Sequence, residues 1–395
     1  MLLSFNSYIM RFLFKYFAGV TLHEILELYL ASKLQDRKHS MGTKPLDGKK
    51  ISEDRKEYYG KLRGHSCAPL WENLAHLITP EPVITAIPYL WDYSEIREDL
   101  LHSAKVISAE EAERRVLMLE NPALEGKARI TESMYAGLQL IMPGEVARAH
   151  RHSPAALRFI VEGSGGYTAV NGEKTYMEPG DFIITPSMAW HDHGNDGSDP
   201  VIWMDGLDLP LVNHIGAMFM DHYPDEQFPE GQPQGDSSVR YGNNMRPIGE
   251  GPDGLDSPIF SYPYSKSRET LEELSKTTEW DPYHGLKLEY IDPTSGGPAM
   301  STISTFLQLL PKGFKTEKYQ TTENTTYSVI EGKGRIIVNM GDSTKTIEWE
   351  DRDIFVVPCW YPHQLEADEN ATIFSFSDKV VQTKLGLYRE RRGNE

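Results

Sequence analysis

The sequence predicts a mainly β protein with two barrels in one chain and a helical region before them. Three observations support this fold class. After Gly126 the chain breaks into short alternating segments separated by turns, a texture typical of sandwiches and barrels. Asn171-Gly172 between two such segments is a strong signal for a two-residue hairpin. The third observation is an internal repeat at an offset of about 170 residues, which indicates duplication of one β-fold.

Composition limits the classes of function. The chain has 395 residues, enough for two or three domains, and a formal net charge of −18. Nucleic-acid binding needs a basic face, so an acidic chain of this kind suits small-molecule chemistry instead. Cys67 and Cys359 are too few and too far apart for a disulfide framework, which indicates reduced thiols inside a cell.

The first 20 residues are apolar and aromatic but carry Arg11 and Lys15, so they form a weak candidate for a membrane span. They resemble a targeting or peripheral amphipathic segment only loosely. We expect an N-terminal extension over residues 1–53, with disorder and targeting both left open. We also expect a cytoplasmic location with no membrane partner, organelle targeting being the minor alternative.

A helical region is expected over residues 54–122. Its clearest element is a helix over Ala112–Leu119, preceded by Ser108-Ala-Glu-Glu111. Ser108 can accept hydrogen bonds from free backbone amides, and Glu111 stands at the capping-box position.

The first barrel is expected over residues 123–221. A linker with a short helix around Ser267–Thr277 follows over 222–298, and the second barrel over 299–395. Pro143-Gly144 turns the chain after the first strand. The strands predicted for the first barrel are Ala136–Met142, Leu157–Glu162, Gly166–Val170, Lys174–Met177, Asp181–Thr185 and Val201–Asp205.

The internal repeat matches three segments of the first barrel with three of the second. In this alignment Tyr319 and Thr321 stand opposite His150 and His152, Tyr361 opposite His191, and His363 opposite His193. The matched pairs are Ile160–Gly165 with Val329–Gly334, Gly180–Pro186 with Asp351–Pro358, and Trp190–His193 with Trp360–His363. A lone histidine without co-ligands is more often structural, so we expect the second barrel to hold no metal.

Three histidines of the first barrel predict a metal site. His150 and His152 are two apart, so on a strand they point to one face. His191 follows a hairpin and a turn bounded by Pro186, which can return it beside them. Three neutral imidazoles would leave coordination positions open for water, substrate and O2. Imidazole also binds zinc, nickel and copper, so the donor set alone does not select iron.

Arg158 extends this pattern. His150, His152, Ala156 and Arg158 are all even-numbered, so an unbulged strand would point them into the barrel together. An arginine inside a barrel is costly unless it is paired. A substrate carboxylate is one candidate partner, because arginine binds carboxylates in fork geometry. An ion pair with an internal acid, such as Glu145 or Asp205, is the alternative.

Two spaced motifs around these histidines resemble the signature motifs of the cupin superfamily. The first motif normally has a glutamate four residues after its second histidine, and here that place is Ala156. Its absence favours a three-histidine site with room for a bidentate ligand. The resemblance implies a bicupin of two jelly-roll, or double-stranded β-helix, barrels. The motifs are Gly144-x5-His150-x-His152 and Gly180-x5-Pro186 followed by His191-x3-Asn195.

Longer segments point to a narrower family. They are His150-Arg-His-Ser-Pro-Ala-Ala-Leu-Arg-Phe159, Pro179-Gly-Asp-Phe-Ile-Ile-Thr-Pro186, Trp190-His-Asp-His-Gly194, Arg114-Arg-Val-Leu-Met-Leu-Glu-Asn-Pro122, Tyr135-Ala-Gly-Leu-Gln139 and Trp203-Met-Asp-Gly-Leu-Asp208. From about Asp54 to Gly386 the chain resembles the gentisate 1,2-dioxygenases and their salicylate and 1-hydroxy-2-naphthoate relatives. This resemblance implies a homotetrameric Fe(II) enzyme of aromatic catabolism. Such an enzyme opens the ring of a small aromatic hydroxy acid with O2 as co-substrate, giving maleylpyruvate from gentisate.

The resemblance also implies a role for each site residue. Fe(II), one per chain, would be held by His150, His152 and His191. Arg158 would hold the substrate carboxylate, with Arg114 reaching in from the helical region. Gln139 and His193 would bond the ring hydroxyl or the oxygen species and steer protons. The remaining residues would line the pocket: Trp203, Asp205, which orients or balances charge, and Tyr135, which resembles the gentisate branch where the salicylate relative has tryptophan.

Four alternatives stay open at this stage. The substrate could be salicylate or 1-hydroxy-2-naphthoate, because the sequence does not fix the pocket volume. The chain could be a bicupin that binds a metal or ligand without turnover. It could be a cupin enzyme of other chemistry, such as an isomerase or a diketone- or flavonol-cleaving oxygenase. A purely structural role would fit the second barrel and not the first.

Overall fold

The computed structural model describes residues 51–251 and 254–393, and the chain divides into two compact units, Met1–Glu81 and Pro82–Glu395. The described part of the first unit holds α3 (Glu53–Gly64), the short 3-10 helix η2 (Leu70–Glu72) and α4 (Leu74–Leu77). The extension and the targeting alternative expected over residues 1–53 fall almost entirely outside the described residues. Within the described ranges, no helix has the length and apolar character needed to cross a membrane.

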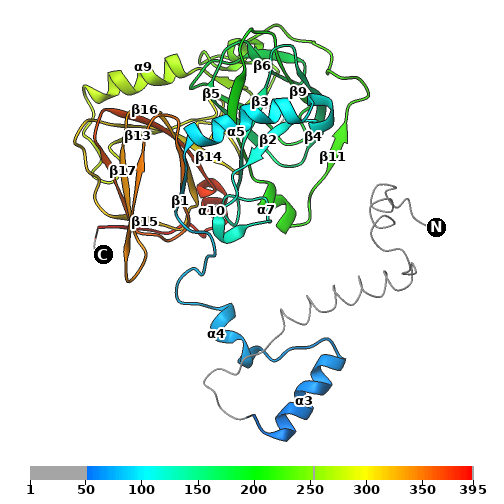
Figure 1. Cartoon of the computed structure of the whole chain (residues 1–395), viewed down its shortest axis with the longest axis vertical. Coiled ribbons are helices and arrows are strands. Elements are labelled where there is room, and N and C mark those ends of the chain that lie inside the picture. The colour runs from blue at the N-terminus through cyan, green and yellow to red at the C-terminus, as the bar shows by residue number, and fades with distance from the viewer. Residues whose placement is uncertain (1–50, 252–253, 394–395) are drawn as a thin grey trace, which may run out of the picture. The chain divides into compact units, whose positions relative to one another are not determined.

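The second unit contains four antiparallel sheets arranged as two barrels (Figure 1). One sheet of the N-terminal barrel has the order β12-β8-β5-β10-β3-β2, and the other has the order β11-β4-β9-β6-β7. The strands are β2 (Arg115–Met118), β3 (Tyr135–Ile141), β4 (Val146–His152), β5 (Ala156–Glu162), β6 (Gly166–Val170), β7 (Glu173–Tyr176), β8 (Phe182–Thr185), β9 (His191–Asn195), β10 (Val201–Leu207), β11 (Met220–His222) and β12 (Ser261–Tyr262).

The C-terminal barrel has the corresponding sheet orders β1-β19-β16-β21-β14-β13 and β18-β17-β20-β15-β22. With the second sheet read from β22 to β18, these orders repeat those of the N-terminal barrel position by position, so the predicted duplication and the bicupin fold class are confirmed. The strands are β1 (Tyr89–Trp91), β13 (Leu286–Glu289), β14 (Ser304–Leu310), β15 (Tyr319–Thr321), β16 (Thr325–Glu331), β17 (Gly334–Asn339), β18 (Thr344–Trp349), β19 (Ile354–Val357), β20 (His363–Ala367), β21 (Ala371–Ser377) and β22 (Glu390–Arg392).

The two barrels exchange their edge strands. β1 comes from the region before the N-terminal barrel, yet it pairs with β19 of the C-terminal barrel. β12 comes from the connection before the C-terminal barrel, yet it pairs with β8 of the N-terminal barrel. The chain therefore crosses between the barrels twice and ties them together through backbone hydrogen bonds.

Short helices complete the second unit. α5 and α9 contribute Leu100 and Leu271 to the core between the barrels, and α9 is the helix expected near Ser267–Thr277. The helices are α5 (Tyr93–Val106), α6 (Ala109–Ala112), η3 (Pro122–Leu124), α7 (Leu209–His214), α8 (Asp236–Tyr241), α9 (Tyr264–Ser275) and α10 (Lys379–Lys384).

Strand alternation sorts the side chains into two environments. Along β5, Leu157 and Phe159 join the core between the barrels, whereas Ile160 joins a small cluster inside the N-terminal barrel. Both faces of this strand are thus covered, and all seven of its residues are buried. Arg158 lies on the same inward face of β5 as Ile160, so its guanidinium lies inside the barrel.

The predicted helix over Ala112–Leu119 is wrong. Ser108 does cap a helix, accepting the Glu111 N–H at 3.1 Å, but that helix ends at Ala112. The chain then turns at Glu113 and continues as β2, which pairs with β3. The Asn171-Gly172 hairpin is confirmed: both residues have positive φ, 48° and 85°, between β6 and β7.

The stacked pair Phe159 and Phe374 joins the two barrels, with ring centroids 4.2 Å apart and planes 7° apart. We expect Phe374→Ala to lower the free energy of unfolding by about 3–5 kcal/mol, because it opens a cavity that cannot collapse between two sheets. Phe374→Leu, which keeps most of the volume, should cost less than about 1.5 kcal/mol. Equal urea midpoints for wild type and Phe374→Ala would contradict this account of the core.

Candidate metal centre

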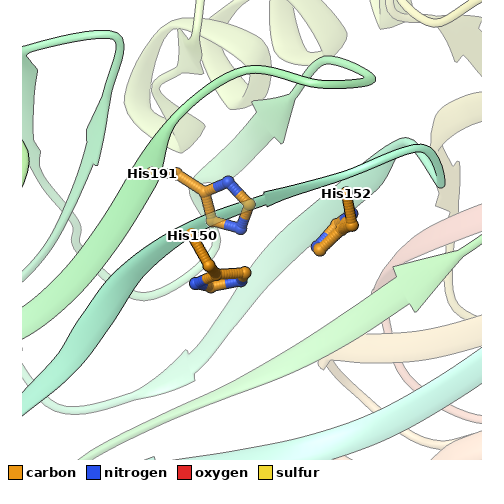
Figure 2. A group of neighbouring side chains, drawn as sticks. All are labelled: His150, His152 and His191. Atoms are coloured by element: carbon orange, nitrogen blue, oxygen red, sulfur yellow. The ribbon is translucent and has the colours of Figure 1, made fainter. Parts of the chain in front are cut away.

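Three imidazoles meet inside the N-terminal barrel, on two neighbouring strands of one sheet (Figure 2). His150 and His152 alternate along β4, and His191 begins β9 directly opposite His150 in the strand register. One ring nitrogen from each lies within 4.8 Å of the others. Among the described residues, this is the only group of three or more potential ligands that meets that criterion.

Backbone carbonyls determine which nitrogen each ring presents. His150 Nδ1 lies 2.8 Å from the Arg148 carbonyl, His152 Nδ1 lies 2.8 Å from that of Pro154, and His191 Nδ1 lies 2.9 Å from that of Ala189. A carbonyl only accepts, so each Nδ1 carries the proton and each Nε2 keeps its lone pair.

These lone pairs fit a divalent metal ion. The Nε2 atoms of His150 and His191 are buried and have no hydrogen-bond partner among the described residues. A buried polar atom without a partner is costly, and metal coordination would satisfy it. A second ring nitrogen held by a backbone carbonyl is the usual outer contact of a metal-bound histidine.

Burial keeps these rings in the neutral form that binds metals. Burial is the largest cause that lowers the pKa of His150 to about 2, and the positive charge of Arg114 adds to it. Burial likewise lowers the pKa of His152 to about 4 and holds that of His191 well below its usual range.

Arg158 points into the barrel as predicted, but by a different route. The prediction assumed one unbulged strand from His150 to Arg158. The structure instead ends β4 at His152, turns over Ser153–Ala155 and begins β5 at Ala156. The β4–β9 pairing also contains a bulge between Ala147 and His150. After the turn, the even-numbered residues of β5 still point into the barrel. The predicted inward direction of Arg158 is therefore correct, although the single unbulged strand from which it was predicted does not exist.

Arg158 is held on three sides and is only 3% exposed. Its Nη1 donates to Thr185 Oγ1 at 2.5 Å, and its Nη2 donates to His193 Nε2 at 2.9 Å. Its Nε lies 3.6 Å from Asp205 Oδ1. The acid considered in the alternative reading is therefore present as Asp205, whereas Glu145 pairs with Arg115 instead.

Asp205 balances charge within this group. Trp203 Nε1 donates to its Oδ1 at 3.0 Å. Burial raises the pKa of Asp205 to about 6 against the opposing pull of Arg158, and burial lowers the pKa of Arg158 to about 10. One carboxylate thus faces two cations, Arg158 and Arg114, and the interior keeps a local excess of positive charge.

Arg114 directly precedes β2 and does not lie on a helix, which the resemblance had implied. The preceding residue, Glu113, has φ 53° and ψ −43°, and Arg114 N–H donates to the Ala112 carbonyl at 2.5 Å. This is a strained turn for a residue with a Cβ. Among the described residues, no hydrogen bond or ion pair engages the Arg114 guanidinium. Its positive charge contributes to lowering the pKa values of His150, His152 and His193.

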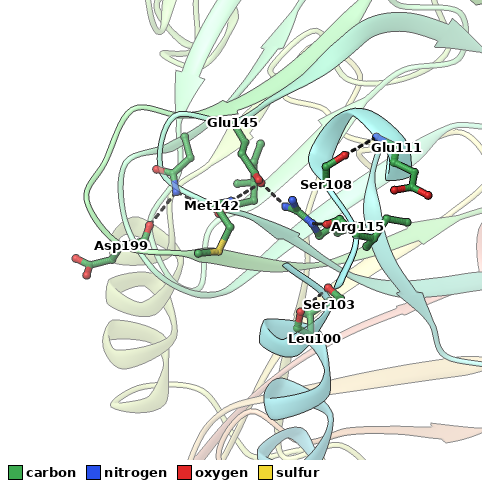
Figure 3. Close-up of polar contacts among 11 residues, drawn as sticks. Leu100, Ser103, Ser108, Glu111, Arg115, Met142, Glu145 and Asp199 are labelled. Atoms are coloured by element: carbon green, nitrogen blue, oxygen red, sulfur yellow. Dashed lines mark hydrogen bonds and ion pairs between the residues drawn. The ribbon is translucent and has the colours of Figure 1, made fainter. Parts of the chain in front are cut away.

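Arg115 anchors the strained turn from the other side (Figure 3). Its guanidinium pairs with the Glu145 carboxylate and donates to the Ile107 carbonyl. Glu145 also accepts the Met142 N–H at 2.9 Å. The two neighbouring arginines therefore differ. Arg115 holds the backbone of the turn through its contacts with Glu145 and Ile107, whereas the Arg114 guanidinium makes no hydrogen bond or ion pair among the described residues.

The remaining predicted residues share the inward face of β3. Gln139 is 3% exposed and is the register partner of both Trp203 and Val116. Tyr135 and Gly137 lie on the same face. A Cβ at Gly137 would come within 2.6 Å of Val116 Cγ1 and 2.8 Å of the Tyr135 hydroxyl, so a glycine here leaves room for these two side chains.

Two buried hydroxyls at the site escaped prediction from sequence. Thr185 accepts from Arg158, and Thr168 Oγ1 lies 3.0 Å from His193 Nδ1. Period-two alternation could have placed both side chains inside the barrel. Their partners follow from strand pairing, which the sequence does not display.

The predicted correspondence between the barrels is wrong in its last segment. His363 was placed opposite His193, but the structure puts it where His191 stands in the first barrel. Its Nδ1 lies 3.0 Å from the carbonyl two residues back, and Tyr319 is its register partner, as His150 is for His191. Trp360 takes the place of Met188: both have positive φ, and their N–H groups donate to Thr321 and His152 respectively.

The C-terminal barrel thus retains one of the three ligand positions as histidine. Tyr319 and Thr321 fill the other two, and Tyr319 is hydrogen-bonded to the Tyr388 hydroxyl at 2.8 Å. By strand register, Phe306 occupies the position in the C-terminal barrel that Gly137 occupies in the N-terminal barrel. That this barrel carries no metal remains a prediction.

Comparisons with known proteins agree with this architecture. The family model of the cupin domain matches residues 137–207. Gentisate 1,2-dioxygenase 1 of Aquipseudomonas alcaligenes is 53% identical over 87% of this chain and 97% of its own length. The 5-aminosalicylate 1,2-dioxygenase of a Comamonas species is 33% identical over 82% of this chain and 86% of its own length.

A solved structure shows the same fold across nearly the whole chain. It is a single-residue variant of the salicylate 1,2-dioxygenase from Pseudoaminobacter salicylatoxidans in complex with gentisate. It superposes with a TM-score of 0.82 at 31% identity, covering 89% of this chain and 98% of the other. With its two barrels, its three-histidine group and these relatives, the chain belongs to the gentisate 1,2-dioxygenase family and is an oxidoreductase of the dioxygenase class.

Proposed function

We propose that this chain is an Fe(II)-dependent dioxygenase that cleaves gentisate between its carboxyl-bearing and neighbouring hydroxyl-bearing carbons, giving maleylpyruvate in aromatic catabolism. One observation carries the proposal. Three lone pairs converge inside the barrel that also holds the buried guanidinium of Arg158, a group suited to a carboxylate, and the nearby Arg114 guanidinium makes no hydrogen bond or ion pair among the described residues. A site with these parts suits a ligand that is both an anion and a metal chelator.

Iron would be held by His150, His152 and His191, with one ion per chain. A bound ferrous ion supplies the one-electron chemistry that lets O2 react with an aromatic ring, which protein side chains cannot do. Because the chain would supply only three ligands to the ion, positions would stay available for the substrate's carboxylate and ortho-hydroxyl oxygens.

The protein side chains would position the substrate. Arg158 would hold the carboxylate in fork geometry, with its own orientation fixed by Thr185, His193 and Asp205. Arg114 would neutralise the remaining charge. Gln139 offers both a donor and an acceptor to a ring hydroxyl.

Gentisate is favoured among the candidate substrates. The relative that shares 53% identity is named for gentisate. Salicylates and 1-hydroxy-2-naphthoate form the second candidate class, because relatives at 33% and 32% identity are named for 5-aminosalicylate and 1-hydroxy-2-naphthoate.

We also propose that the chain assembles as a homotetramer, as the family resemblance implies. Exposed apolar side chains near β11 support an interface between copies of the chain. They are Ile215, Met218, Phe219 and Met220, which are 67%, 40%, 67% and 42% exposed.

An oxygen-electrode assay tests the proposed reaction. Protein loaded anaerobically with Fe(II) should consume one O2 per gentisate, and the ring-opened product should appear as new near-ultraviolet absorbance. Salicylate and 1-hydroxy-2-naphthoate should support slower uptake. No uptake with any of these acids would refute the proposal, and a faster rate with 1-hydroxy-2-naphthoate would replace gentisate as the preferred substrate.

We expect His152→Ala to lose both bound iron and oxygen uptake, because two imidazoles remain where three converge. Iron content per chain after desalting measures the first effect directly. His102→Ala, which changes an exposed histidine on α5, is the control and should retain both. A fully active His152→Ala protein would overturn the ligand assignment.

We expect Arg158→Lys to keep its iron but to raise the KM for gentisate by about tenfold or more. The ammonium preserves the charge facing Asp205 but loses the planar fork that a carboxylate needs. Steady-state kinetics and iron content measure the two effects separately. Arg335→Ala, in the C-terminal barrel, is the control. Loss of iron in Arg158→Lys would mean that the arginine maintains the metal site itself.

A further inference from the structure

His193 lies beside the three ligand histidines, yet both of its ring nitrogens have protein partners. Arg158 Nη2 lies 2.9 Å from its Nε2, and Thr168 Oγ1 lies 3.0 Å from its Nδ1. Both His193 and Thr168 are almost fully buried, at 1% and 0% exposed. The ring is therefore committed to a protein hydrogen-bond chain.

Donor and acceptor rules give this chain one direction. A guanidinium only donates, so His193 Nε2 must hold a lone pair and the ring proton must sit on Nδ1. Thr168 Oγ1 must then accept that proton. Its own hydroxyl hydrogen points to Met177 Sδ, 3.4 Å away. The order of donation is Arg158 to His193, His193 to Thr168, and Thr168 to Met177.

The direction matters for Arg158. If His193 carried its proton on Nε2, two donors would face each other across 2.9 Å, and the guanidinium would have to turn away. The guanidinium therefore favours the ring form with a bare Nε2, and Thr168, the only partner of Nδ1 among the described residues, completes that form by accepting the Nδ1–H. Without this acceptor the Nδ1–H would be buried and unpaired, which would weaken the contact that helps to orient Arg158.

The C-terminal barrel shows the same fold without this chain. Strand register places Tyr327 at the position of Arg158, Leu365 at that of His193 and Ile336 at that of Thr168. All three lie in the apolar core of that barrel. The barrel architecture thus does not require the polar chain, which accompanies the three-histidine group instead.

We propose that Thr168 is a positioning residue for the reaction. Its hydroxyl accepts the Nδ1–H of His193 and thereby stabilises the ring form whose Nε2 accepts from Arg158. The identity of the bound carboxylate rests on the proposed function. The hydrogen-bond chain itself rests on the contacts in this barrel.

The neighbouring strand supplies a matched control. Thr175 is the cross-strand partner of Thr168, is 7% exposed, and has a buried hydroxyl without a hydrogen-bond partner among the described residues. Thr168→Val and Thr175→Val make the same chemical change on the same face of one sheet. Only the first removes an acceptor that His193 uses.

Kinetics with gentisate test the effect on binding. Thr168→Val should raise KM about tenfold, the effect of one lost hydrogen bond, with iron content unchanged. Thr175→Val should match wild type, and Thr168→Ser should restore KM. A KM for Thr168→Val within twofold of that for Thr175→Val overturns the proposal. So does a loss of kcat alone that tracks a lower Tm, because that result describes packing only.

A spectroscopic test needs no turnover. In iron-free protein labelled with 15N-histidine, the His193 signals can be identified by their absence from His193→Asn. Wild type should show a protonated Nδ1 and a bare Nε2, and Thr168→Val should shift protonation toward Nε2. Unchanged His193 signals in Thr168→Val overturn the proposal. If wild type fails to oxidise gentisate, the proposed function falls while this measurement still decides the role of Thr168.

Discussion

The site depends on one recurrent interaction, a backbone carbonyl that accepts the Nδ1–H of a buried histidine. Arg148, Pro154 and Ala189 supply these carbonyls. Each contact fixes a ring tautomer without using a charged group, so three lone pairs can converge in a space where burial already opposes protonation. The nearby arginines can then be buried because they face neutral rings and one carboxylate, and not a cluster of cations.

The duplicated barrel shows which features belong to the fold and which to the site. Both barrels keep the same strand order and the same two-sided burial of their central strands. The N-terminal barrel has Gly137 and Arg158 on the inward faces of two of its strands. The C-terminal barrel fills the corresponding positions with Phe306 and Tyr327. An interior that is polar in one copy and aromatic in the other is evidence for specialisation after duplication.

Much of this could be predicted from sequence, because period-two alternation and hairpin signals are local. The bounds of most strands in the first barrel followed from alternation alone, whereas the inward side of Arg158 was predicted correctly only because the turn between β4 and β5 preserves parity. The strand after Glu113 did not, because a capped start at Ser108 says nothing about a strained turn five residues later. His363 was misplaced because the shift near Trp360 is visible only in backbone conformation. Thr168 and Thr185 were missed because their partners come from strand pairing.

The exchanged edge strands make the order of synthesis matter. The Tyr93 N–H, just after β1, donates to Asp353, a residue 260 positions further along the chain. A nascent chain that has completed the N-terminal barrel must still hold β1 unpaired until β19 emerges. Contacts of such long range slow folding and expose strand edges to aggregation. Neither half of this protein is therefore a self-sufficient folding unit, and cutting the connection between the barrels would leave each half with an orphaned strand edge.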